Sequence, residues 1–174
     1  MYEEEMRYTI AKLLQEKSTD EALEEAVSDI FGRALESSKK AGVSLESVVY
    51  EIMEGVEAGL EDSNRFSESY LNHASELIVA TIHKEGMKRL ACEEHKMHAA
   101  QHRFNEVLAL ESSYLKDSME SFRQYAVDKH HGILLTQLDR LEMKTASILR
   151  KMAERFGYNK YISLHKKRTS HYDR

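Results

Sequence analysis

Residues 65–129 read RFSESYLNHASELIVATIHKEGMKRLACEEHKMHAAQHRFNEVLALESSYLKDSMESFRQYAVDK, without proline and with Gly86 as the one glycine. A glycine inside a helix costs only about 1 kcal/mol relative to alanine, so Gly86 alone does not end a helix. We therefore expect a very long amphipathic helix in this region, which at about 1.5 Å per residue would span roughly 98 Å. Because one helix of that length cannot bury its apolar side alone, it needs partner helices.

Two apolar registers follow one another along residues 104–152. The first has a broadly heptad spacing with Glu111 and Lys129 as polar misfits, and the second alternates steps of four and three residues. The registers are offset by one residue near His130-His131-Gly132, which indicates either a skip within one long coil or a turn that folds the chain back. We favour the turn, because Gly132 is the available helix breaker at this point.

We expect residues 65–156 to form a long helical arm or a hairpin that ends in a C-terminal helix, as in a coiled-coil bundle. Apolar stripes on such helices bind other helices, so the stripe residues are candidates for an interaction surface. These candidates are Phe104, Leu108, Leu115, Met119, Phe122, Leu134, Leu138, Leu141, Ile148 and Met152.

A short N-terminal three-helix unit is predicted for residues 1–62. Ser18 and Glu21 have the spacing of a capping box, which starts a helix, and Gly42 is placed to end that helix in the left-handed conformation. Gly55 and Gly59 lie about one turn apart on the third predicted helix. This spacing of residues without side chains favours close packing against another helix.

Charge is unevenly distributed along the chain. Residues 1–62 carry 16 acidic and 6 basic side chains, whereas residues 63–174 carry 14 acidic and 19 basic ones. Such asymmetry can orient self-association or attract an acidic partner. The last segment, residues 157–174, interleaves aromatic and basic residues, and we expect it to be a flexible basic tail. An alternative hypothesis is that this tail binds nucleic acid or another anionic surface.

The composition predicts an all-α protein that stays in the cytoplasm. The chain has no proline, no tryptophan and 7 glycines, too few turn residues for a β fold. No apolar run approaches the roughly 18–20 residues of a transmembrane segment. The acidic start of the chain is the reverse of a secretory signal, and the lone Cys92 suits a reducing compartment.

Residue patterns of known enzyme classes are missing from the sequence. The glycines are not spaced to cradle a phosphate at a helix start, and no Gly-x-Ser-x-Gly elbow occurs. We therefore expect no catalytic residues and no cofactor. The leading hypothesis is a non-enzymatic helical scaffold or adaptor that associates with itself as a homodimer or larger assembly, and with other helical proteins.

One cluster of potential metal ligands gives a second hypothesis, a metal-binding helical bundle. Cys92, His95, His98 and His102 are spaced three or four residues apart, so neighbouring members would lie one helical turn apart. Thiolate and imidazole ligands at this spacing suit Zn²⁺ or copper when a further side chain completes the site. The opposing interpretation is a polar stripe on a solvated helix.

Overall fold

The computed structural model describes residues 1–95 and 101–155, except for the side chains of residues 101 and 102. The described part contains helices and no strand, which confirms the all-α prediction. Because α2, a π-helical turn η1 and α3 follow one another without a break, these elements make six helices. They are α1 (Tyr2–Leu13), α2 (Thr19–Ala26), η1 (Val27–Phe31), α3 (Gly32–Ala41), α4 (Glu46–Asp62), α5 (Glu68–His95), α6 (Gln101–Asp128) and α7 (Gly132–Arg155).

The predicted signals of the N-terminal helices are confirmed. Ser18 Oγ accepts a hydrogen bond from the Glu21 N–H at 3.4 Å, and the Ser18 N–H donates to the Glu21 carboxylate, which completes the capping box at the start of α2. Gly42 has a φ of 66° and ends α3 in the left-handed conformation.

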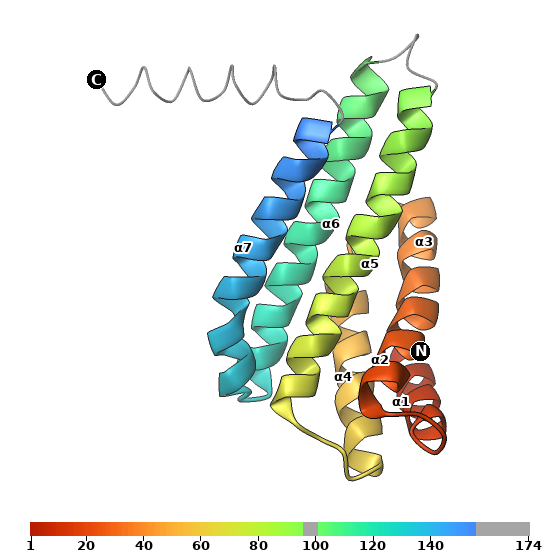
Figure 1. Ribbon diagram of the computed structural model, residues 1–174, viewed down its shortest axis with the longest axis vertical. Coiled ribbons are helices and arrows are strands. Elements are labelled where there is room, and N and C mark those ends of the chain that lie inside the picture. The colour runs from red at the N-terminus through yellow and green to blue at the C-terminus, as the bar shows by residue number, and fades with distance from the viewer. Residues whose placement is uncertain (96–100, 156–174) are drawn as a thin grey trace, which may run out of the picture.

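The prediction of one very long helix over residues 65–129 is wrong. α5 and α6 lie side by side and run in opposite directions, with the connection at residues 96–100, outside the described residues (Figure 1). The physical reason is burial: a helix of that length would leave its apolar face in water, whereas a folded-back pair covers both faces.

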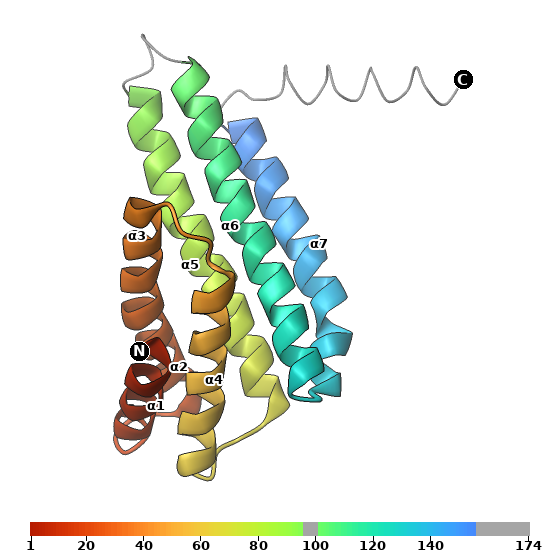
Figure 2. The same ribbon diagram turned by 180° about the vertical axis from the view of Figure 1, so that it is seen from behind.

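The predicted turn between α6 and α7 is confirmed, but its left-handed residue differs. His130 has a φ of 57°, whereas Gly132 begins α7 with no positive φ. Histidine is among the residues that adopt this conformation more often than most non-glycine residues. After the turn, α7 packs against both α6 and α5, so the three long helices form an antiparallel bundle (Figure 2).

The N-terminal helices cover one part of this bundle. α1 packs on α4, α4 packs on α6, and η1 packs on α5, whereas α7 lies at the opposite edge of the molecule (Figures 1 and 2). The main core combines side chains from residues 1–62 with side chains from α5, α6 and α7. A smaller core of Leu90, Phe104, Leu108 and Met152 fills the end of the three long helices.

Close packing at the two glycines of α4 is also confirmed. A Cβ atom on Gly55 would lie 2.5 Å from the Glu3 carbonyl oxygen and 2.7 Å from the Met6 Cβ. A Cβ atom on Gly59 would lie 3.0 Å from the Arg7 carbonyl oxygen. The missing side chains therefore allow α1 to lie directly against α4.

Among the described helices, none combines the length and the apolar character needed to cross a membrane.

Candidate functional site

The residues predicted to form an interaction surface lie in the core of the single chain. All are buried except Ile148, which is partly buried and packs against both cores. The small core takes Phe104, Leu108 and Met152, and the main core takes Leu115, Met119, Phe122, Leu134, Leu138 and Leu141. Because intramolecular packing covers these side chains, a surface for self-association must be sought elsewhere on α6 and α7.

The predicted metal ligands lie at the end of α5 and beyond it. Cys92 and His95 are exposed on the last turns of α5. His98 and the side chain of His102 lie outside the described residues, as does the basic tail at 157–174. Within the described part, no three ligand side chains gather closely enough to hold a metal ion. The metal site and the tail therefore stay predictions.

Glu111, the first polar misfit in the apolar register, belongs to a buried ion pair. Its side chain is 0% exposed, and its Oε1 lies 2.7 Å from Nζ of Lys39, whose side chain is 4% exposed. Arg89 lies 3.5 Å from the same oxygen, and the Lys39 ammonium lies 5.4 Å from the centroid of the Tyr114 ring. Burial lowers the pKa of Lys39 more than the bond to Glu111 raises it.

This ion pair lies between the two hydrophobic cores. Leu108 belongs to the small core and Leu115 to the main core, and Glu111 stands between them on α6. A Cβ on Gly86 would lie 3.2 Å from Glu111 Oε2, so the glycine leaves space for the buried carboxylate. A shift of α3 against α6 would separate these two buried charges, so the pair disfavours such a shift.

An open hollow of about 440 Å³ adjoins the ion pair on the side of α3 and α5. Its cations are already paired with carboxylates: Arg33 with Asp29, and Lys40 with Glu36. The acidic side chains in its wall offset the basic ones, so the hollow has little electrostatic preference for an anion.

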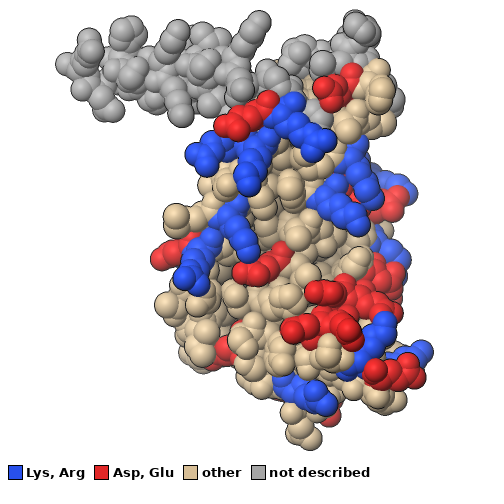
Figure 3. All heavy atoms as spheres, in the orientation of Figure 1, with Lys and Arg blue, Asp and Glu red and all other residues tan. Residues whose placement is uncertain are grey.

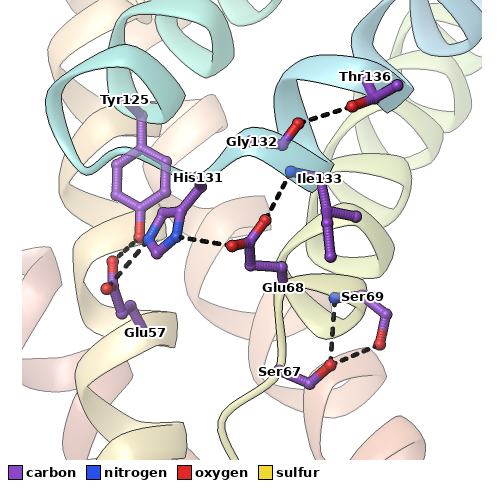
Figure 4. A network of polar contacts seen from close by, with 9 residues as sticks. All are labelled: Glu57, Ser67, Glu68, Ser69, Tyr125, His131, Gly132, Ile133 and Thr136. Atoms are coloured by element: carbon purple, nitrogen blue, oxygen red, sulfur yellow. Dashed lines mark hydrogen bonds and ion pairs between the residues drawn. The ribbon is translucent and has the colours of Figure 1, made fainter.

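His131 is the centre of a second polar cluster, where four segments of the chain meet (Figure 4). His131 Nε2 lies 3.1 Å from Glu57 Oε1 on α4, and Nδ1 lies 3.8 Å from Glu68 Oε1 at the start of α5. The Tyr125 hydroxyl on α6 donates to Glu57, and the Ile133 N–H on α7 donates to Glu68 at 2.7 Å. Both carboxylates are therefore held in place by hydrogen bonds that do not involve His131.

The side chains of the His131 cluster are largely buried, and their contacts hold neighbouring segments of the chain together. The side chains of His131, Glu57 and Glu68 are 9%, 17% and 23% exposed. Burial, together with the bond to Glu57, raises the pKa of the Tyr125 phenol. The neighbouring Tyr50 hydroxyl donates to Asp128 at 2.8 Å, and burial and this bond raise its pKa to about 12. Together these bonds tie the α6–α7 turn to α4 and α5.

Lys129, the second polar misfit, pairs with Glu54 at 3.1 Å in the same region. Both misfits of the apolar register thus mark polar contacts with the N-terminal helices. Their partners, Lys39 and Glu54, show no sequence pattern that links them to the misfits, because each pair joins residues far apart in the chain.

A groove between α6 and α7 is the strongest candidate for a functional surface. It has a volume of about 470 Å³, and all its lining residues lie on α6 and α7. Carbon atoms make up most of its exposed lining surface, although only Met119, Ala146 and Leu149 of its nine lining residues are apolar. The others are Ser112, Lys116, Glu120, Arg123, Glu142 and Thr145. Across it Arg123 pairs with Glu142, and the Thr145 hydroxyl lies 3.7 Å from the Met119 sulfur.

Large apolar side chains are exposed on the same two helices. Met143 is 74% exposed, Ile133 55%, Val127 52% and Leu135 36%. Leu135, Ala146 and Leu149 each follow a core position of α7 by one residue, which is the sequence signal for a second apolar strip beside the core stripe.

The charge asymmetry of the sequence is visible on the surface. Figure 3 shows Lys and Arg gathered over the upper parts of α5 and α7, and Asp and Glu concentrated over the N-terminal helices.

No protein-family model, no curated protein and no solved structure matches this chain.

Proposed function

We propose that this protein is a non-enzymatic helical scaffold that associates with itself through the groove between α6 and α7. The observation that supports the proposal is the combination of this groove with the large apolar side chains that are exposed on the same two helices. Contiguous apolar surface on a helical protein is typical of a site that another helix covers.

The free energy gained by covering this groove is modest, which favours reversible association. Burying one large apolar side chain contributes about 1.5–3 kcal/mol, and association itself costs several kcal/mol in lost freedom of motion. A stable complex therefore needs the groove and the flanking side chains to be covered together. An amphipathic helix of another protein could use the same groove, and we favour a second copy because the rim of the groove is complementary to itself in charge.

Sedimentation velocity of the full chain over a wide range of concentrations tests this proposal. We expect the mass to rise from that of the 20.2 kDa chain toward twice that value as the concentration increases. A mass that stays at one chain over the whole range would overturn the proposal.

A further inference from the structure

The rim of the α6–α7 groove carries charges of both signs in a defined order. The α6 side presents Lys116 and Arg123 with Glu120 between them, and the α7 side presents Glu142. Arg123 and Glu142 mark one level across the groove, because their side chains form an ion pair. Met119 and Thr145 mark the next level, about one helical turn away, since their side chains are in contact.

Two kinds of two-fold axis could bring two such grooves face to face. An axis parallel to the helices places α6 of one copy opposite α7 of the other at the same level, so that Arg123 meets Glu142 of the second copy. An axis across the helices places α6 against α6 in the opposite direction and brings Lys116 near Arg123. The first arrangement pairs opposite charges and the second pairs like charges, so the charges favour the first.

We propose that α6 and α7 of two copies form an antiparallel four-helix bundle about a two-fold axis parallel to the helices. This inference rests on the proposed self-association and names its geometry. Each helix then has two antiparallel neighbours, one from its own copy and one from the other, as in a four-helix bundle. Ala146 and Leu149 of both copies fill the space between the four helices.

The dimensions of the groove indicate a weak to moderate dimer. Residues 112–127 of α6 extend about 24 Å at about 1.5 Å per residue, and two packed helices present a face about 20 Å wide. The contact thus covers roughly 480 Å² on each copy, or about 1,000 Å² in total, at the lower limit of specific interfaces. We therefore expect the dimer to dissociate on dilution.

Ala146→Glu tests the floor of the groove. Ala146 is exposed, so the chain can accept the substitution without losing its core, while the added carboxylate would be buried in the dimer. We expect the dimer to weaken by at least about tenfold in sedimentation, with an unchanged helical circular dichroism spectrum. Val43→Glu is the matched control, because Val43 is 52% exposed on the connection between α3 and α4 and should leave the dimer intact.

A charge exchange tests the direction of the axis. Glu142→Arg and Arg123→Glu should each weaken the dimer, because like charges then face each other across the two copies. A mixture of the two variants should restore it, since every facing pair in the mixed dimer is again opposite in charge.

The outcomes separate the two proposals. A wild-type chain that stays monomeric would overturn both. A wild-type dimer that Ala146→Glu leaves intact would overturn association through the groove, and the four-helix arrangement with it. A dimer that Ala146→Glu weakens, but that the mixture of charge variants does not restore, would overturn the four-helix arrangement alone.

Discussion

The buried pair of Lys39 and Glu111 gives the sharpest test of how the structure accounts for stability. Glu111→Gln preserves the shape of the side chain and removes its charge, which leaves the Lys39 ammonium, 4% exposed, without its main partner. Arg89 is 43% exposed and can turn toward solvent, so its own loss is small. Breaking a buried ion pair on one side costs about 3–5 kcal/mol.

The chemistry of lysine sets an upper limit on this loss. An isolated buried ammonium gives up its proton when burial costs more than deprotonation. Deprotonating a lysine at pH 7 costs about 5 kcal/mol, since pH 7 is about 3.4 pH units below the ordinary lysine pKa and each unit is worth about 1.36 kcal/mol. We therefore expect Glu111→Gln to reduce the free energy of unfolding by about 3–5 kcal/mol at pH 7, measured by urea denaturation followed by circular dichroism.

Two controls make the result specific. The double variant Lys39→Met/Glu111→Leu removes both charges and should recover most of the stability, because an apolar pair of similar volume needs no ion pairing. Glu36→Gln removes the carboxylate that pairs with Lys40 on the exposed face of α3, at 2.9 Å, and should cause no measurable change.

The loss of unfolding free energy in Glu111→Gln should depend on pH with a definite sign. Burial holds the pKa of Lys39 below its ordinary value, and the loss of Glu111 lowers that pKa further. Between the folded and the ordinary pKa the unfolded chain binds more protons, so the free energy of unfolding rises with pH. The deficit of Glu111→Gln should therefore shrink as the pH increases from 7 toward 10. A variant that loses no more than Glu36→Gln at pH 7, or a double variant less stable than Glu111→Gln, would refute the reasoning.

Three further predictions concern other contacts. Gly55→Ala should destabilise the chain by about 2–3 kcal/mol in urea denaturation, because its Cβ would meet the Glu3 carbonyl oxygen at 2.5 Å. Gly32→Ala, with no atom within 4 Å of the added Cβ, should be neutral or stabilising by up to about 1 kcal/mol; equal losses for the two would show that α1 does not lie on α4. The Tyr50 phenol, with a pKa of about 12, should ionise late in an ultraviolet titration, and Tyr50→Phe should remove this late step. Because the folded pKa lies above the ordinary value of about 10, this group contributes stability that is lost as pH rises from about 10 to about 12, and the loss should be smaller in the variant. His131→Ala should lower the thermal midpoint, at a cost of about 1–3 kcal/mol, because Glu57 loses its 3.1 Å contact with the imidazole that lies between Glu57 and Glu68; an unchanged midpoint would remove the structural role of this cluster.

Local signals in the sequence predicted local structure well. The capping box at Ser18 and Glu21, the left-handed Gly42 and the close approach at Gly55 all depend on residues within a turn or two of each other, or on the absence of a side chain. Such features are set by short-range sterics and hydrogen bonding, so one sequence is enough to locate them.

Longer-range features were predicted less well, for a physical reason. Glu111 was visible as a polar misfit, but its partner Lys39 lies 72 positions away, and no pattern in the sequence connects the two. The connection between α5 and α6 was missed because the 96–100 stretch contains neither proline nor glycine. α5 and α6 pack against each other and bury the apolar faces of both helices, which is a gain of the whole bundle rather than a local preference.

The sequence identified the apolar core stripe of α7 but not the apolar strip that lines the α6–α7 groove. The core stripe of α7, including Leu138 and Leu141, was identified from its spacing, but its side chains are used inside the chain. The strip one residue along, at Ala146 and Leu149, was overlooked because a single helix gives no indication of which of two adjacent apolar strips a neighbour will cover.

Cross-linking between copies tests the proposed interface most directly. In an Arg123→Lys variant, a carbodiimide can join the new amine to Glu142, its neighbour across the groove. When isotopically labelled and unlabelled chains are mixed before the reaction, we expect cross-linked peptides that combine one labelled and one unlabelled partner. If every such cross-link is fully labelled or fully unlabelled, the contact lies within one chain and the proposed self-association through α6 and α7 is contradicted.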